Sequence, residues 1–126
     1  MLIKRILVID DEKAIQEVIQ ACLEELGDWE VLTAGSGTEG LYVAESKLPD
    51  GILLDITMPD MDGFETLQKL QKNSRTQWIP VALLTATVHP KSLTEFNKLG
   101  IAGVIHKPFN PLMLINQIAE AFHWEL

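Results

Sequence analysis

The chain has 126 residues, of which 47% are hydrophobic and 22% are charged, and its formal net charge is −8 at pH 7. This length fits one domain, which we expect to cover residues 1–126, and no apolar run approaches the roughly 20 residues of a membrane-spanning helix. Binding to DNA, RNA or an anionic membrane depends on lysine and arginine side chains that neutralise phosphates. The negative charge therefore argues against all three and favours protein partners.

Residues 1–5 lack the long apolar segment and the small-residue cleavage site of a secretory signal, which favours a cytoplasmic location. The single cysteine, Cys22, cannot form an internal disulfide. Its position among Ile15, Ile19 and Leu26 predicts a small buried hydrophobic side chain rather than a nucleophile.

Apolar runs alternate with segments of helical periodicity five times along the chain. The apolar runs predict strands at 6–9, 30–34, 52–54, 81–84 and about 103–106. The intervening and following segments predict helices at 13–26, 38–47, about 64–72, about 90–100 and from 111 onwards.

Glycine and proline support these boundaries. Gly27 and Gly100 end two of the helices, and Pro90 suits the first turn of another because its missing N–H would be unpaired there. Asn110-Pro111 combines a cap with a first-turn proline. In that last helix the predicted inward-facing residues are Leu112, Ile115, Ile118, Ala119 and Phe122.

This alternation predicts an α/β fold of the (βα)5 type. Strands without polar alternation are typical of a parallel sheet that helices cover on both faces. Right-handed crossovers leave few arrangements, and we expect the flavodoxin-like strand order 2-1-3-4-5. In that order the first and third strands flank the point where neighbouring loops diverge to opposite faces of the sheet.

Charged and hydroxylic residues follow these strands. Asp10-Asp11 ends the first strand, Asp55 the third and Thr85 the fourth, and Lys107 follows the fifth. Because the carboxyl ends of parallel strands meet at one edge, these side chains should share one crevice. Crowded carboxylates repel one another unless a cation compensates, and Mg²⁺ accepts both carboxylate and phosphate oxygens.

This crevice suits phosphoryl transfer. Asp55, the lone acid on the central strand, is the candidate nucleophile that would form an acyl phosphate. The acid pair Asp10-Asp11 serves better as a metal-binding group. Thr85 and Lys107 would stabilise negative charge on the phosphoryl oxygens during transfer.

Over essentially its whole length, the chain resembles the receiver domain of two-component response regulators. The matching features are the acid pair, the central Asp55, the stretch from Met58-Pro59 to Asp62-Gly63, Thr85-Ala86 and Lys107-Pro108-Phe109. The resemblance implies a signalling switch, not a turnover enzyme on an external substrate. It implies that Asp55 accepts phosphate from a phosphohistidine of a sensor histidine kinase or a histidine phosphotransfer protein.

The resemblance also implies a ligand set for Mg²⁺. Asp11 and Asp55 would bind the ion directly, Asp10 largely through water, and the backbone carbonyl of Thr57 would complete the protein ligands. It further implies a cis peptide bond before Pro108. Output would pass to a downstream protein on the face formed by the fourth helix, fifth strand and fifth helix.

Two departures from the family bear on function. Val104 stands three residues before the lysine, where the family commonly has an aromatic residue that follows the movement of the threonine hydroxyl. Thr57 and Thr87 occupy positions that influence dephosphorylation, and neither side chain is well suited to orient a water molecule. We therefore expect a fairly persistent acyl phosphate and a switch without its aromatic part.

We expect a stand-alone receiver that signals through a partner protein or a phosphorelay, with an excised part of a longer protein as the alternative. The first helix has an apolar strip wider than core packing needs, with Ala14, Ile15 and Val18 near its start. This strip is the predicted docking surface for the kinase.

Two other functions remain as alternatives. Gly35-Ser36-Gly37-Thr38-Glu39-Gly40 matches the G-x-G-x-x-G fingerprint of dinucleotide-binding domains. It follows the second strand, however, and a helix-capping turn with permissive glycines is the simpler interpretation. A receiver-like binding module that acts without phosphate is the second alternative.

Overall fold

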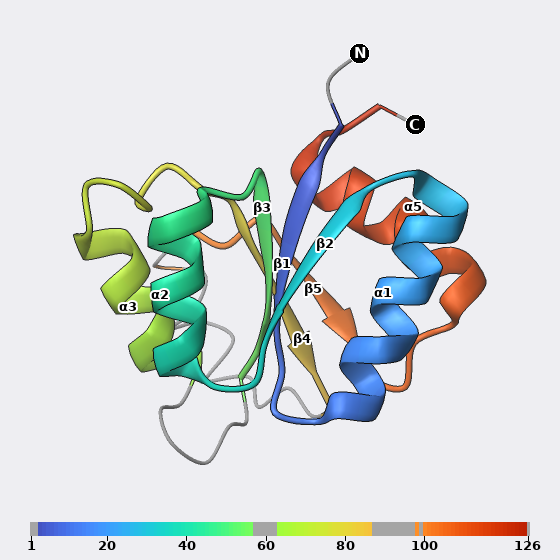
Figure 1. Cartoon of the computed structure of the whole chain (residues 1–126), viewed down its shortest axis with the longest axis horizontal. Coiled ribbons are helices and arrows are strands. Elements are labelled where there is room, and N and C mark those ends of the chain that lie inside the picture. Colours follow the sequence, from blue (N-terminus) through green and yellow to red (C-terminus); the bar gives the residue numbers. More distant parts are fainter. Residues whose placement is uncertain (1–2, 57–62, 87–97, 99, 126) are drawn as a thin grey trace.

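The computed structural model describes residues 3–56, 63–86, 98 and 100–125. Five parallel strands form one sheet in the order β2-β1-β3-β4-β5 (Figure 1). The strands are β1 (Arg5–Ile9), β2 (Glu30–Ala34), β3 (Gly51–Asp55), β4 (Val81–Thr85) and β5 (Gly103–His106). The helices are α1 (Lys13–Gly27), α2 (Gly37–Lys47), α3 (Gly63–Lys72) and α5 (Pro111–Phe122). The predicted fold class and strand order are confirmed.

Helices cover both faces of the sheet, with α1 and α5 on one face and α2 and α3 on the other (Figure 1). Successive side chains of a strand point to opposite faces, so each central strand contributes to two hydrophobic clusters. Ile6 and Val8 of β1 pack in the cluster with α1 and α5, whereas Leu7 and Ile9 pack in the cluster with α2. The central strands β1, β3 and β4 are therefore apolar along most of their length, as the sequence indicated.

Local capping explains most of the helix boundaries. The hydroxyl of Ser36 accepts a hydrogen bond from the backbone N–H of Glu39 at 3.1 Å, which caps the start of α2. At the start of α5, the side chain of Asn110 accepts one from the N–H of Leu112 at 2.9 Å, as predicted. Helix α1 continues through Gly27, one residue further than predicted, and the left-handed residue that ends it is Asp28.

The prediction that Leu112 faces inward is wrong, because 74% of its surface is exposed. The buried stripe of α5 is formed by Leu114, Ile115, Ile118, Ala119 and Phe122. At 3.6 residues per turn, the centre of this stripe lies about 90° around the helix from Leu112. The helix predicted near 90–100 falls mostly outside the described residues.

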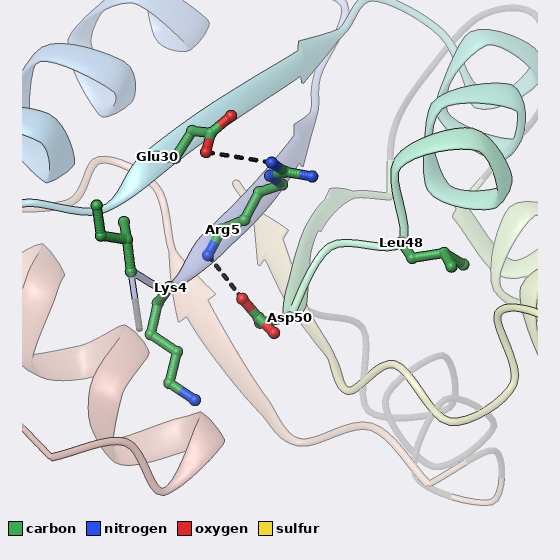
Figure 2. A pocket seen from close by; sticks show the side chains of 6 residues that line it. Lys4, Arg5, Glu30, Leu48 and Asp50 are labelled. Carbon is green, nitrogen blue, oxygen red and sulfur yellow. Dashed lines mark hydrogen bonds and ion pairs between the residues drawn. The ribbon is translucent and has the colours of Figure 1, made fainter. Parts of the chain in front are cut away.

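Arg5 ties together three neighbouring segments at the amino-terminal edge of the sheet (Figure 2). Its guanidinium contacts Glu30 of β2 at 3.3 Å and the backbone carbonyl of Lys47 at 3.2 Å. Its backbone N–H donates to the carboxylate of Asp50 at 2.8 Å, and the N–H of Asp50 donates back to the carbonyl of Arg5 at 2.7 Å. These bonds fix where β1 and β3 begin.

The two ends of the described chain meet at that same edge. The ammonium of Lys4 lies 5.2 Å from the ring centre of Trp124, which packs edge-on against Trp29 at 5.1 Å. Phe122 lies 5.0 Å from the same ring. In the described part of the chain, no helix combines the length and the apolar character needed to cross a membrane.

Close packing of α2 on the sheet depends on one glycine. A Cβ at Gly40 would lie 2.5 Å from Cδ1 of Ile9, which is fully buried. Gly40, the last glycine of the Gly35–Gly40 motif, therefore serves helix packing, and Ser36 serves as the helix cap. Both observations support the capping interpretation of this motif over the dinucleotide fingerprint.

Candidate functional site

The acidic residues at the ends of β1 and β3 come together at the carboxyl edge of the sheet. Ile9 pairs with Leu54 in the parallel ladder, so the residues that follow them, Asp10 and Asp55, are neighbours. Carboxylate oxygens of Asp10, Asp11 and Asp55 all lie within 4.8 Å of one another. Asp10 and Asp55 are buried, whereas Asp11 is exposed.

Lys107 is the cation of this cluster. The last residue pair of the β4–β5 ladder joins Thr85 to His106, and the N–H of Lys107 donates to the carbonyl of Thr85 at 2.7 Å. This hydrogen bond holds the backbone of Lys107 beside the end of β4, so the side chain of Lys107 can reach the acids. Its ammonium then lies 2.9 Å from Asp10 and 3.6 Å from Asp55.

A fourth carboxylate, that of Glu12, also reaches this ammonium at 3.6 Å. Burial acts to lower the pKa of Lys107, but the close contact with Asp10 and the negative charges of Asp55 and Glu12 outweigh it and raise the pKa above its usual value. Lys107 therefore stays charged throughout the physiological range.

The carboxylate of Asp10 is held at both oxygens. Its Oδ1 accepts a hydrogen bond from the backbone N–H of Glu12 at 2.8 Å. Its fully buried Oδ2 contacts Lys107 as an ion pair but has no hydrogen bond of regular geometry. Glu12 is the N-cap residue of α1, and the side chain of Glu12 forms no capping hydrogen bond.

The cluster fits a hard divalent cation. The ammonium of Lys107 contacts three carboxylates, those of Asp10, Glu12 and Asp55, and the carboxylate of Asp11 lies beside Asp10 and Asp55, so negative charge remains uncompensated. Three of these carboxylates converge closely enough to share an ion, and they are the oxygen donors that Mg²⁺ prefers. Thr57, which the resemblance adds to this ligand set, lies outside the described residues.

Thr85 lies where the sequence placed it, as the last residue of β4, and is fully buried. The peptide bond between Lys107 and Pro108 is cis, in agreement with the resemblance. Val104 lies on β5 and is half-buried. Thr87 and the stretch from Met58 to Asp62 fall outside the described residues.

An open groove adjoins the cluster between α1 and the segment that leads into α5. It has a volume of about 500 Å³ and is mainly apolar. Ile15 and Val18 line it from α1, Pro108 and Phe109 line it from the other side, and Lys107 is also one of the lining residues. Val18 is 45% exposed. The wide apolar strip predicted on the first helix is therefore one wall of a groove that reaches the acids.

Sequence reasoning missed two residues around the cluster, Glu12 and Gln16. Glu12 directly follows the acid pair, so its charge could have been added to the cluster from sequence position alone. The side chain of Gln16 donates hydrogen bonds to the backbone carbonyls of Asp10 and Ala34. No motif marks it, because this contact depends on the angle at which α1 leaves the sheet.

A family model described as the response regulator receiver domain matches residues 6–119. The chain belongs to this family. Receiver domains are signalling modules rather than turnover enzymes, and the acid cluster described above is typical of them.

Individual relatives agree. The chain is 37% identical over 106 residues to the response regulator Rre1 of Synechocystis sp., a match that covers 84% of this chain and 46% of the relative. The chain thus spans less than half the length of this curated relative. Among solved structures, the chemotaxis protein CheY4 of Vibrio cholerae is 31% identical with a TM-score of 0.89, covering 95% of this chain and 99% of that one. A CheY-like receiver domain protein of Methanospirillum hungatei is 32% identical with a TM-score of 0.88, and the match covers 97% and 95% of the two chains.

Proposed function

We propose that this receiver domain is a phosphorylation-dependent switch that accepts a phosphoryl group on Asp55. The observation that carries the proposal is the convergence of the Asp55 carboxylate with Asp10 and Asp11 beside the ammonium of Lys107. The alternative, a dinucleotide-binding function, assigns no role to the charged residues of this cluster.

In the proposed reaction, a carboxylate oxygen of Asp55 forms a bond to the phosphorus of a phosphohistidine while the bond from phosphorus to the histidine nitrogen breaks. Lys107 and Thr85 then stabilise the negative charge of the phosphoryl oxygens. Mg²⁺ held by Asp10, Asp11, Asp55 and the carbonyl of Thr57 would neutralise charge on the acids and on the phosphoryl group when bound.

Access to the nucleophile constrains this reaction. Only 1% of the surface of Asp55 is exposed, so side chains at the rim of the cluster must move before a phosphodonor reaches it. Asp11 and Glu12 are both exposed and lie on that rim, and binding of a cation there would draw Glu12 away from Lys107.

The decisive experiment is labelling of the protein with ³²P-acetyl phosphate in the presence of Mg²⁺. We expect incorporation of one ³²P-labelled phosphoryl group in the wild type and none in Asp55→Asn, because the amide cannot act as the nucleophile. Asp50→Asn, which changes an acid at the opposite edge of the sheet, is the matched control and should label normally. Equal labelling of the wild type and Asp55→Asn would refute the assignment of the nucleophile.

The groove beside α1 is the proposed docking surface for the phosphodonor, a sensor histidine kinase or a histidine phosphotransfer protein. It is mainly apolar, and Lys107 of the acid cluster is one of its lining residues. Ile15→Glu should slow transfer from the protein donor while leaving labelling by acetyl phosphate intact, because the small donor does not need the groove. Comparable slowing with both donors would point instead to damage at the acid cluster.

Output is proposed to pass to a partner protein through the face that includes β5 and α5, or onward in a phosphorelay, within the cytoplasm. The stand-alone character of the receiver and the fairly persistent acyl phosphate belong to the same proposal. Beryllofluoride mimics the bound phosphoryl group, so a pull-down with and without it should reveal the partner. If Asp55→Asn retained unchanged partner binding, the phosphate-independent module would become the better description.

A further inference from the structure

We propose that Gln16 is a positioning residue for the acid pair Asp10-Asp11, acting through the backbone at the ends of β1 and β2. This inference rests on the proposed function, because it assigns Gln16 a part in holding Mg²⁺ at the phosphorylation site. It concerns a residue on α1 that carries no charge and touches none of the acidic side chains in the described contacts.

The amide of Gln16 bridges two strand ends. Its Nε2 lies 2.6 Å from the carbonyl oxygen of Asp10 and 3.2 Å from that of Ala34. An amide nitrogen has two hydrogens, so one group can supply both bonds. Both partners are acceptors, which requires the nitrogen rather than the oxygen of the side chain to face them.

These bonds take over where the sheet stops. Ile9 and Ala34 form the last residue pair of the β1–β2 ladder, after which the N–H of Asp10 still donates to the carbonyl of Ala34 at 3.0 Å. Beyond this point no backbone group of the described residues continues the ladder, and the side chain of Gln16 on α1 donates the next hydrogen bond, to the carbonyl of Asp10. The side chain thus fixes the backbone at the residue where β1 turns toward the helix.

The acid pair depends on this backbone to different degrees. Asp10 is also held through its own side chain, by the N–H of Glu12 and by Lys107. The side chain of Asp11 is exposed and forms no hydrogen bond or ion pair with any residue that the structure describes. The position of the Asp11 carboxylate is therefore set by its backbone, and Gln16 bonds to the peptide unit that joins Asp10 to Asp11.

This arrangement predicts that Gln16 affects cation affinity more than it affects the chemistry of transfer. Groups that orient a ligand from outside the coordination shell typically change metal affinity by about 10-fold to 100-fold. Gln16 acts on the backbone of Asp11 rather than on its carboxylate, so we expect the change in Mg²⁺ affinity to be near tenfold. Once Mg²⁺ is saturating, the ion itself holds Asp11 in place, and transfer should proceed at its usual rate.

The test compares Gln16→Met and Gln16→Ala with Gln20→Met. Gln20 lies one turn further along α1 and forms no side-chain hydrogen bond with the described residues, so it controls for loss of an amide from this helix. Calorimetric titration with MgCl₂ should give a dissociation constant about tenfold higher for both Gln16 variants and unchanged for Gln20→Met. The Mg²⁺ concentration for half-maximal acetyl phosphate labelling should shift in parallel, with the maximal rate preserved.

Urea unfolding in EDTA measures the stability of each Gln16 variant without bound cation, and so detects a purely structural role of Gln16. A Gln16 variant that is less stable but binds Mg²⁺ as the wild type does would overturn the inference. So would a lower labelling rate that saturating Mg²⁺ fails to restore. Gln16→Ala is the second variant in case methionine packs badly at this position. Alanine is the strongest helix former, so this substitution should preserve α1. If the wild type bound Mg²⁺ but took no label on Asp55, the proposed function would fail while the role of Gln16 in cation binding could still be measured.

Discussion

At the scale of single residues, we expect the contact between Lys107 and Asp10 to contribute to stability. The Asp10 side chain is fully buried and the Lys107 side chain is only 12% exposed, so neither charge is well solvated. Removing one partner of such a pair leaves a buried charge without compensation, which costs far more than the pair itself contributes.

Lys107→Met should therefore destabilise the protein. We expect the free energy of unfolding in EDTA to fall by about 3 kcal/mol, the lower end of the range for breaking a buried pair. The double variant Asp10→Asn/Lys107→Met should recover a large part of this loss, because it removes the orphaned charge as well. Urea denaturation measures both, and additive effects of the two single substitutions would contradict the coupling.

Cys22 gives a pH dependence whose sign follows from its surroundings. The thiol is buried on α1, as predicted, and donates to the carbonyl of Pro111 at 2.8 Å. Burial, and to a lesser degree the charge of Glu25, raises its pKa. The native thiol therefore keeps its proton at pH values where the unfolded chain, with a thiol pKa of about 8.5, loses it.

Because the native state binds the extra proton, this contribution to stability is complete below the unfolded pKa and is lost as pH rises through the native pKa. Cys22→Ala should show a shallower fall in the free energy of unfolding between about pH 8 and pH 10 than the wild type does. The smaller side chain of alanine also lowers the free energy of unfolding, but by the same amount at every pH. The slope of this free energy against pH is therefore unaffected by that loss. Parallel slopes would mean that the native thiol titrates normally.

At the scale of secondary-structure elements, the packing of α2 on β1 depends on Gly40. Alanine is about 1 kcal/mol better than glycine inside a helix, so propensity alone favours Gly40→Ala. The added methyl group would, however, overlap the buried side chain of Ile9. Overpacking of a core typically costs about 1–3 kcal/mol, so we expect net destabilisation.

Ile9→Val provides the matched compensating change, because it removes the Cδ1 atom that the new methyl group would meet. Chemical denaturation should show that Gly40→Ala is better tolerated in the Ile9→Val background than in the wild type. A gain in stability from Gly40→Ala alone would mean that α2 can move away from the sheet without loss.

The elements were predictable because their signals are local. The central strands β1, β3 and β4 are apolar runs buried on both faces, and Ser36, Asn110 and Pro111 mark helix starts by their own chemistry. Leu112 was wrongly predicted because a position at the margin of a helical stripe is decided by the neighbouring layer, not by spacing. The convergence of Asp10, Asp11 and Asp55 followed from parallel topology alone.

Two further contacts of the site were not predictable in this way. The contacts of Glu12 with Lys107, and of Gln16 with two carbonyls, depend on rotamers and on the helix entry angle. Neither quantity is encoded by residue type or by spacing along the chain.

At the scale of the whole molecule, the excess of acidic residues connects cation binding to folding. The net charge of −8 opposes compaction, and part of it is concentrated at the carboxyl edge of the sheet. A ligand that binds only the folded state stabilises it by mass action. Stability should therefore respond to Mg²⁺ beyond what general screening supplies.

We expect MgCl₂ to raise the free energy of unfolding more than NaCl does at equal ionic strength. Asp11→Asn should be more stable than the wild type in EDTA, because one repelling charge is gone, and should gain less from Mg²⁺. Paired urea titrations in the two salts measure these differences. Equal responses to both salts in the wild type would remove the evidence for a specific cation site.

The contact of Lys4 with Trp124 has a practical consequence for handling the protein. It holds both described ends of the polypeptide at the margin of the sheet opposite the acids, as the path of the chain in Figure 1 also shows. The five residues of β1 separate that margin from Asp10, a span of roughly 17 Å. A tag or surface tether attached near either of these ends therefore leaves the edge of the sheet that carries the acids turned toward the solution, an orientation that immobilised binding assays require.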